Sequence, residues 1–527
     1  MYRRFRAPRR HGEVLADPPL EEAGCLLRAN RLSRARYDCD IQGQPLEELV
    51  SAARRHLRAA ALQYTAAYRD VAPPPDAGAP FILAGHQPQL FHAGVWFKNF
   101  ALSSAGRHLG AVAVNLLIDN DILQNPSIRV PALSPSGPVV TTIAFDQVAE
   151  AIPYEERAVV DGDLFTSFGR RVAETIEPFQ SQPLIRRLWP MVVQAAEQRS
   201  NVGQAIAEGR HRIEAAWGLQ TLEVPLSAIC RSRPFLGFTA HILAHLPRFH
   251  EIHNTALSEY RAANRVRSRS HPVPDLAADG AWLEAPFWIW SSDRPHRRRL
   301  FVRPAGEQLV LTDREGFETR IALSEDRDAC RAVDQLSDEA ERGIKVRPRA
   351  LLTTMYARLV LSDLFVHGIG GAKYDELTDL IIQRFFGLCP PRFMTLSATA
   401  LLFEDATPRL RAELHEKRRR LRELSFHPER HVAPSPEVEQ LVAEKRHWIR
   451  VSPPRGQRLE RHRAIERINR ALEEYLVADR RRLARECRRL EAELRCQTQL
   501  ASREFSFCLF SEDALRALLL DLARLAP

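Results

Sequence analysis

The chain lacks the patterns that mark membrane and secreted proteins. None of its apolar runs approaches the roughly 18 residues that a membrane-spanning helix requires. The basic N-terminus, MYRRFRAPRRHGE, is followed by no apolar segment and no small-residue cleavage site. We therefore expect neither a secretory signal nor a membrane anchor, and a cytoplasmic location.

Cysteine is present, but not in a pattern typical of metal or redox sites. The 8 cysteines are scattered, and no pair has CxxC spacing. A zinc ribbon and a thioredoxin-type site are therefore not expected, and the thiols are interpreted as reduced structural residues. The four histidines at 241, 245, 250 and 253 lack the His-Glu-x-x-His arrangement, so we interpret them as part of a surface helix and assign no metal.

The composition is that of an ordinary globular protein, with 45% hydrophobic and 27% charged residues. A length of 527 residues is too great for one core, so two or three domains are expected. The formal charge of +9 suits a nucleic acid or a small polyanionic substrate, and is also compatible with an Arg-rich composition alone.

The stretch 80–125 organises the rest of the chain. An apolar run at 81–83 is followed by a polar loop, a predicted helix at about 95–109, and a second apolar run at 111–118. This is the order of a right-handed βαβ unit, in which ligands lie beyond the carboxyl ends of the strands. The candidate site residues are Gly85, His86, Gln87, Gln89, His92, Gly94, Lys98 and Asn99 after the first strand, and Asp119, Asn120 and Asp121 after the second.

The chemistry of these residues suggests specific roles. His86 and His92 can donate hydrogen bonds to a developing negative charge, and Lys98 with the helix amides near Gly94 can hold an anion. Asp119 or Asp121 can receive an ammonium group or its proton, or bind Mg²⁺ through water. The alternatives are a buried polar turn whose histidines satisfy backbone carbonyls, and an Asx turn or helix cap at the acidic residues.

A second strand, Gly-rich turn and helix occur within 345–400. An apolar run at 364–366 leads into His367-Gly-Ile-Gly-Gly, and helical spacing follows from 374 to 386. Glycines permit close backbone approach, and with a following helix they favour anion binding; the alternative is a tight structural turn. The motif is not a Walker loop, because its spacing to lysine is wrong and no Ser or Thr follows. The candidate ligands, expected to close the pocket from the opposite side, are His367, Gly370, Gly371, Lys373 and Tyr374.

The C-terminal part is rich in Arg, Glu and Leu. Apolar residues step by three and four through 457–500, which predicts one long helix forming an antiparallel coiled coil with 409–449. Proline-rich breaks are expected at 428–436 and 453–456. The arginines could bind nucleic acid, but the interleaved glutamates favour a solvated coiled-coil face.

These patterns predict an α/β fold: a Rossmann-like parallel sheet core with an inserted smaller α/β domain and a C-terminal α-helical coiled coil. The predicted segments are an N-terminal helical lead-in (1–79), the first part of the core with a helical insertion (80–270), a small insertion with a β-hairpin (271–344), the second part of the core (345–407), the coiled coil (408–502) and a tail that packs back on the core (503–527).

The order of these parts resembles the bacillithiol-biosynthesis cysteine-adding enzyme family. The segment 84–90, AGHQPQL, stands where that family has Thr-Gly-Gln-Gln-x-Gly-Leu, and 119–121 matches its acidic strand end. The segment 370–373, GGAK, is similar to its Gly-Pro-Gly/Ala-Glu turn with Lys replacing Glu, and 390–399, PPRFMTLSAT, is similar to its Pro-x-Pro-x-x-x-x-Arg-x-Ser strand. His-Ala-Gly at 92–94 partly matches the His-x-Gly-His signature of nucleotidyltransferases.

The resemblance implies a core related to nucleotidyltransferases, a coiled coil used in homodimerisation, an adenine nucleotide (ATP or ADP), and ligation of cysteine to a glucosamine–malate conjugate. We therefore expect a ligase-like enzyme that joins an amine, with cysteine as one candidate, to a small anionic carboxylate or sugar-conjugate metabolite. The alternatives are a nucleic-acid-binding or assembly protein that uses a basic coiled coil on an inactive core, and a purely structural scaffold.

Overall fold

The computed structural model describes residues 5–72, 75–76, 78–135, 137–199, 201–268, 271, 273–326, 328–452 and 458–524. The chain forms two compact units. The first contains Met1–Val130, Thr141–Ala400 and Arg503–Pro527, and the second contains Pro131–Val140 and Leu401–Ser502. None of the described helices combines the length and apolar character needed to cross a membrane.

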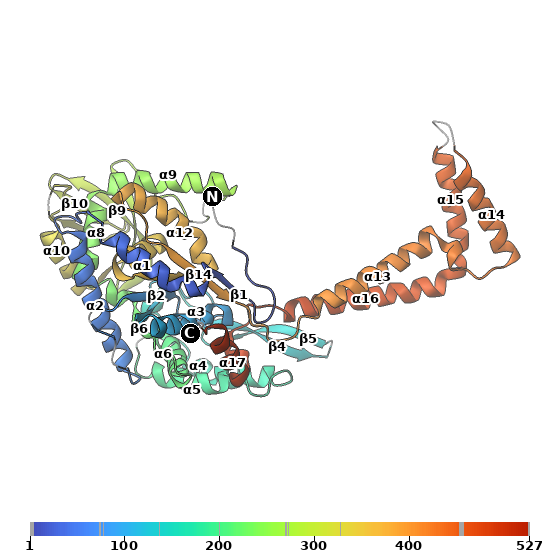
Figure 1. Cartoon of the computed structure of the whole chain (residues 1–527), viewed down its shortest axis with the longest axis horizontal. Helices are drawn as coiled ribbons and strands as arrows, with labels where there is room; N and C mark the ends of the chain where they lie inside the picture. The colour runs from blue at the N-terminus through green and yellow to red at the C-terminus, as the bar shows by residue number, and fades with distance from the viewer. Residues whose placement is uncertain are drawn as a thin grey trace. The chain divides into compact units, whose positions relative to one another are not determined.

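The first unit is built on a six-stranded sheet (Figure 1). Its strand order is β1-β14-β13-β2-β3-β6; the five strands from β14 to β6 run parallel, and β1 pairs antiparallel with β14. The carboxyl ends of parallel strands meet at one edge, so the residues after β2, β3 and β13 are brought together. The bounds are β1 (Val14–Asp17), β2 (Phe81–His86), β3 (Val112–Leu117), β6 (Leu222–Pro225), β13 (Leu364–His367) and β14 (Phe393–Ala398).

Helices cover both faces of this sheet, because alternate strand residues point to opposite sides. Phe81, Leu83 and Val114 belong to the main apolar core, which also contains buried residues of α2 and α8. On the other face α3 packs so closely that a Cβ at Gly106 would lie 2.9 Å from the Ala113 Cβ. The helix and strand predicted at 95–109 and 111–118 correspond to α3 (Ala93–His108) and β3.

A second sheet in the same unit is antiparallel, with the order β11-β10-β9-β8-β12 and with β7 paired to β8. It carries aromatic and arginine side chains toward the carboxyl edge of the first sheet. Its bounds are β7 (Ala278–Asp279), β8 (Trp282–Ser291), β9 (Arg294–Ala305), β10 (Gln308–Thr312), β11 (Glu318–Ile321) and β12 (Ile344–Pro348).

The glycine-rich segment after β13 is the start of a helix. The sequence predicts a turn before a helix at 374–386, whereas α12 begins at Ile369 with Gly368 as its N-cap. The φ angles of Gly368, Gly370 and Gly371 are not positive, so these glycines do not supply a left-handed turn. They leave room at the first helical turn, where the amide groups have no partner within the helix.

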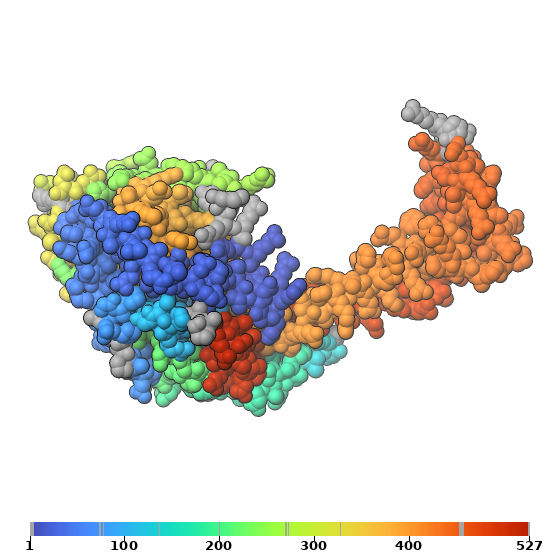
Figure 2. Space-filling view, viewed as in Figure 1, coloured from blue at the N-terminus to red at the C-terminus, as the bar shows by residue number. Residues whose placement is uncertain are grey.

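The remaining helices of the first unit surround these two sheets. The C-terminal helix α17 contacts α3 and is visible in red on the surface in Figure 2. The bounds are α1 (Ala23–Arg34), α2 (Leu46–Ala66), α4 (Gly162–Ile176), α5 (Ile185–Ala196), α6 (Val202–Ala216), α7 (Leu226–Ile229), α8 (Arg233–Ala244), α9 (Leu246–Asn264), α10 (Cys330–Glu341), α11 (Ala350–Tyr356), α12 (Ile369–Ile381) and α17 (Glu512–Leu522). Strands β4 (Ser127–Ser134) and β5 (Gly137–Ala144) form a hairpin whose tip belongs to the second unit.

The second unit consists mainly of two helix pairs, α13 with α16 and α14 with α15, which lie at an angle to each other (Figure 1). Leu410, Leu414, Cys487 and Leu490 form one of its small apolar clusters. The single helix predicted for 457–500 is wrong, because a 3-10 turn at Glu474–Leu476 separates α15 from α16 and each packs on a different partner. The predicted break at 453–456 lies outside the described residues. The bounds are α13 (Thr407–Phe426), α14 (Pro436–Arg450), α15 (Arg458–Glu473) and α16 (Val477–Leu500).

Candidate functional site

A cavity of about 640 Å³ opens at the carboxyl edge of the parallel sheet. The ends of β2 and β13 and the loop after β3 form one side of it, and β8, β9, α9 and α11 form the other. This volume is within the range of small-molecule sites. Of the residues predicted from the sequence, those lining the cavity are Gly85, His86, Gln87, Lys98, Asn120, Asp121, His367, Gly370, Gly371 and Tyr374.

Lys98 is a buried amine at the cavity wall. The side chain is 4% exposed, and its Nζ donates a hydrogen bond to the Gly85 carbonyl at 3.2 Å. In the described part of the chain no carboxylate forms an ion pair with it, and burial lowers its pKa to about 8. A Cβ at Gly368 would lie 3.8 Å from Nζ, so the amine lies beside the N-terminus of α12.

His367 is held in place by Asp375. Its Nε2 lies 2.7 Å from Oδ2 of Asp375, which also accepts from Arg358 at 2.6 Å, while Thr354 donates to Oδ1 at 2.7 Å. Burial alone would raise the pKa of Asp375, but the Arg358 and His367 charges lower it below its usual range. An ionised Asp375 only accepts hydrogen bonds, so Nε2 of His367 carries a hydrogen and donates it to Asp375, which fixes the orientation of the ring.

His86 is anchored from behind by a buried polar chain. Its Nε2 lies 3.1 Å from Oδ1 of Asn99, and the Asn99 amide donates to Glu214 at 2.8 Å. Burial, followed by the charges of Arg210 and Lys98, lowers the pKa of His86 well below its usual value. The structure therefore places Asn99 behind the cavity wall, where it orients His86.

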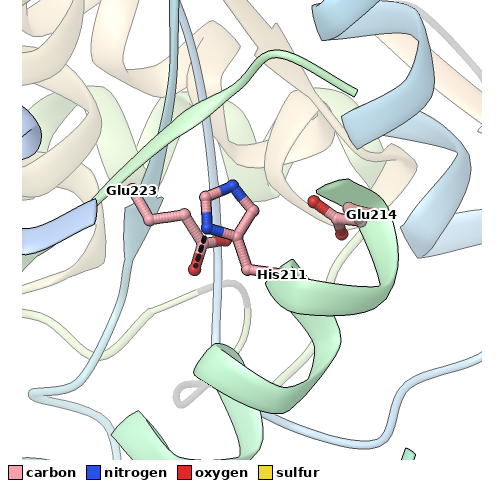
Figure 3. A group of neighbouring side chains, drawn as sticks. All are labelled: His211, Glu214 and Glu223. Carbon is pink, nitrogen blue, oxygen red and sulfur yellow. Dashed lines mark ion pairs between the residues drawn. The ribbon is translucent and has the colours of Figure 1, made fainter. Parts of the chain in front are cut away.

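The carboxylates Glu214 and Glu223 lie near His211 in a group that has the residue types of a metal site (Figure 3). Their ligand atoms lie within 4.8 Å of one another and all three residues are buried. However, Arg210 forms ion pairs with both glutamates, and the Tyr68 hydroxyl lies 2.6 Å from Nδ1 of His211. The positive charge inside the cluster is thus supplied by Arg210. We therefore interpret the cluster as a buried ion-pair network and not as a metal site.

The three residues after β3 have different environments. Asp119 is buried away from the cavity lining and accepts from the Ser227 backbone at 3.0 Å and from its hydroxyl at 2.5 Å. Burial, followed by the Glu155 charge, raises the pKa of Asp119 to about 7. Asn120 donates to the Pro348 carbonyl at 2.9 Å. Asp121 faces the cavity, accepts from Gln87 at 3.0 Å, and forms a 3.2 Å ion pair with Arg297.

Besides Asn99 and Asp119, four predicted site residues do not line the cavity: Gln89, His92, Gly94 and Lys373. His92 caps α3 by accepting from the Gly94 amide at 3.1 Å, and its Nε2 lies 3.6 Å from Glu504. A Cβ at Gly94 would lie 2.1 Å from the Ala398 carbonyl, so this glycine is required for packing. Gln89 and Lys373 are exposed.

The far wall of the cavity is formed by residues that were not predicted from the sequence. The guanidinium groups of Arg349 and Arg297 lie 4.2 Å and 4.8 Å from the ring centroid of Trp288. Cation–π contacts of this kind hold the arginines against the wall. The aromatic run at 287–290 and the arginines at 297–299 are visible in the sequence, but neither pattern indicates that they reach the edge of the parallel sheet.

No model of a known protein family matches the chain, and no curated protein matches it. The resemblance to the cysteine-adding family therefore depends on the order of the parts and on the short motifs.

Proposed function

We propose that the protein is a ligase-like enzyme that binds a small anionic metabolite in this cavity and joins an amine to it. The observation that carries the proposal is Lys98, a buried amine without an ion-pair partner in the described chain, beside the first turn of α12. A helix N-terminus and a nearby amine are complementary to a carboxylate or phosphate.

The remaining wall residues suit the second substrate. Asp121 is partly exposed, at 38% of its side chain, and can receive an ammonium group. His367, oriented by Asp375, can accept a proton from that amine as its nitrogen attacks the carboxyl carbon. The new carbon–nitrogen bond forms while one carboxyl oxygen leaves with its activating group.

The family resemblance adds finer elements to this proposal. Cysteine is a candidate for the amine. The core is Rossmann-like, and α13 and α16 form a coiled coil that supports homodimerisation. An adenine nucleotide, when bound, would supply the activating phosphoryl or adenylyl group. The amides of α12 with Lys98 fit the phosphate of such a group.

Thermal unfolding tests the proposal. The panel is inorganic phosphate, ATP, ADP, malate, citrate, cysteine and amino-sugar conjugates, each with and without Mg²⁺. A ligand at 100 times its dissociation constant adds about 2.7 kcal/mol to the free energy of unfolding, which raises the melting temperature measurably. Lys98→Met should abolish the shift caused by anions, whereas Lys417→Met, in the second unit, should keep it. Absence of a shift with every anion would contradict the proposal.

A second candidate function is nucleic-acid binding by the second unit. Residues 401–502 contain 24 Lys and Arg against 17 Asp and Glu, so +7 of the formal charge of +9 lies in this segment. Ion pairs such as Lys417–Glu486 and Arg418–Glu491 neutralise part of it. Binding of duplex DNA or RNA whose affinity falls steeply and linearly with the logarithm of salt concentration would favour this function.

A further inference from the structure

Lysine is rare in this protein, and the five lysines have different surroundings. Only five of the 75 basic residues are lysines, and the rest are arginines. Lys345, Lys417 and Lys445 form ion pairs with Glu156, Glu486 and Glu429. Lys373 is exposed on α12. Lys445 is also buried, but it is paired with Glu429, whereas the only hydrogen bond of the buried Lys98 in the described structure is to a backbone carbonyl.

The environment of Lys98 disfavours an ammonium group. The side chain is removed from water, and in the described part of the chain no carboxylate forms an ion pair with it. The first turn of α12 adds the positive end of a helix dipole beside Nζ. Burial places the pKa of this amine near 8, so at pH 7 its uncharged fraction is a few hundred times that of an ordinary lysine.

The uncharged fraction of a lysine that lines a cavity is nucleophilic. Nζ lies at the wall of a space large enough for a small metabolite, and the amides of α12 beside it can hold an anionic substituent. An arginine at the same position would bind the anion as well, but it could not act as a nucleophile, because its guanidinium stays protonated.

We propose that Lys98 is a carbonyl-reactive amine and that the cavity accepts a small anionic aldehyde or ketone as an imine on its Nζ. The Nζ lone pair attacks the carbonyl carbon, and a carbon–nitrogen double bond replaces the carbon–oxygen double bond. The carbonyl oxygen takes both amine hydrogens and leaves as water. The step requires no oxidant, reductant or further reactant.

The inference shares with the proposed function the premise that the cavity binds an anion, but it assigns a different chemistry to Lys98. Ligation of an amine to a carboxylate needs no covalent bond to the protein. The two ideas can therefore fail separately.

The test uses the full-length protein and pyridoxal 5′-phosphate, an aldehyde that carries a phosphate. Imine formation is followed by visible absorbance at pH 7, borohydride then reduces the imine to a stable amine, and peptide mass spectrometry identifies the modified lysine. We expect modification of Lys98 that saturates with reagent, that inorganic phosphate suppresses, and that is at least tenfold slower with pyridoxal, which lacks the phosphate.

Two variants and the other lysines serve as controls. Lys98→Arg should keep the melting-temperature shift caused by phosphate and lose the saturable adduct, and Lys98→Met should lose both. Modification at the exposed Lys373 should increase linearly with reagent concentration, and inorganic phosphate should not change it. Melting temperatures without ligand show whether the variants remain folded. If a variant does not fold, the pattern of lysine modification in the wild-type protein still tests the proposal.

The proposal is overturned if Lys98 stays unmodified while the other lysines react, or if all five react alike without saturation. A phosphate-induced shift in melting temperature together with an unreactive Lys98 would contradict the imine and support the anion site. A saturable Lys98 adduct that inorganic phosphate does not suppress would support the imine and contradict the anion site.

Discussion

At the scale of single residues, the chemistry of the candidate site depends on which side chains have a charged partner. Lys98 has none in the described chain, whereas His367 is held by Asp375, which itself contacts Arg358. The partners of His86 are a neutral amide and a backbone carbonyl. The cavity therefore presents an amine whose burial favours the neutral form, next to a histidine in a fixed orientation.

Asp375→Asn should destabilise the protein by about 3 to 5 kcal/mol at pH 7, because it leaves the buried Arg358 without its fully buried counter-charge. The folded-state pKa of Asp375 is lowered, so its stabilising contribution is present above the unfolded pKa of about 4 and is lost as pH falls. Urea unfolding at several pH values should show the difference from the wild type shrinking in acid. Asp379→Asn, which changes a more exposed partner of Arg358, should have a smaller effect, and equal effects would contradict the interpretation.

Asp119→Asn should have the opposite pH dependence. The folded-state pKa of Asp119 is raised to about 7, so its protonated form stabilises the fold at low pH and that contribution is lost as pH rises toward 7. The variant should match the wild type near pH 4 and exceed its free energy of unfolding by about 2 to 4 kcal/mol above pH 7. Denaturant unfolding at pH 5 and pH 8 measures this, and a less stable variant at pH 8 would show that the ionised carboxylate of Asp119 stabilises the fold, which contradicts the raised pKa.

At the scale of secondary structure, the site depends on where two helices begin. Helix α3 begins beside the C-terminal segment, with His92 as its N-cap, and α12 begins at the cavity. Both starts contain glycine, but for different reasons. Gly94 is required because the Ala398 carbonyl approaches it, whereas in the described structure no atom lies within 4 Å of a Cβ at Gly370.

Gly94→Ala should therefore destabilise the protein by about 1 to 3 kcal/mol, because the added methyl group overlaps the Ala398 carbonyl. Gly370→Ala is the matched control, since it adds the same methyl group to the first turn of a helix where there is space. It should be neutral or stabilising by about 0.4 to 1 kcal/mol. Chemical denaturation compares the two, and equal losses would show that the close approach at Gly94 is not limiting.

At the scale of the whole molecule, the two units have cores of different size. The first contains one large apolar cluster that spans both of its main sheets. The described apolar clusters of the second unit are small and contain three or four buried residues each. Surface ion pairs, which are numerous on its helices, add little to stability.

We expect the second unit to unfold first, so that two transitions are observed. Trp448 is the one tryptophan in residues 401–502, and the other six belong to the first unit. Heating should reduce the helical circular dichroism in two steps, while tryptophan fluorescence follows mainly the second. Trp448→Phe should leave the later fluorescence transition unchanged. Coincident single transitions by both probes would contradict this expectation.

The sequence by itself determined the main elements of the fold that carry the site. Apolar runs and turn residues predicted the strands at 81–83, 111–118 and 364–366, and the polar residues at their ends. These features are local, because strand and helix periodicity can be recognised within a short window. The mixed α/β class and the parallel part of the sheet follow from their order along the chain.

Only the tertiary structure decided which polar residues meet in one cavity. Lys98 lines it and Lys373 does not, although both follow a strand and a glycine. Trp288, Arg297 and Arg349 reach the same cavity from a separate antiparallel sheet and the loop that follows it. The direction of each side chain depends on the packing of segments that are distant in sequence, and the spacing of residues along the chain does not contain that information.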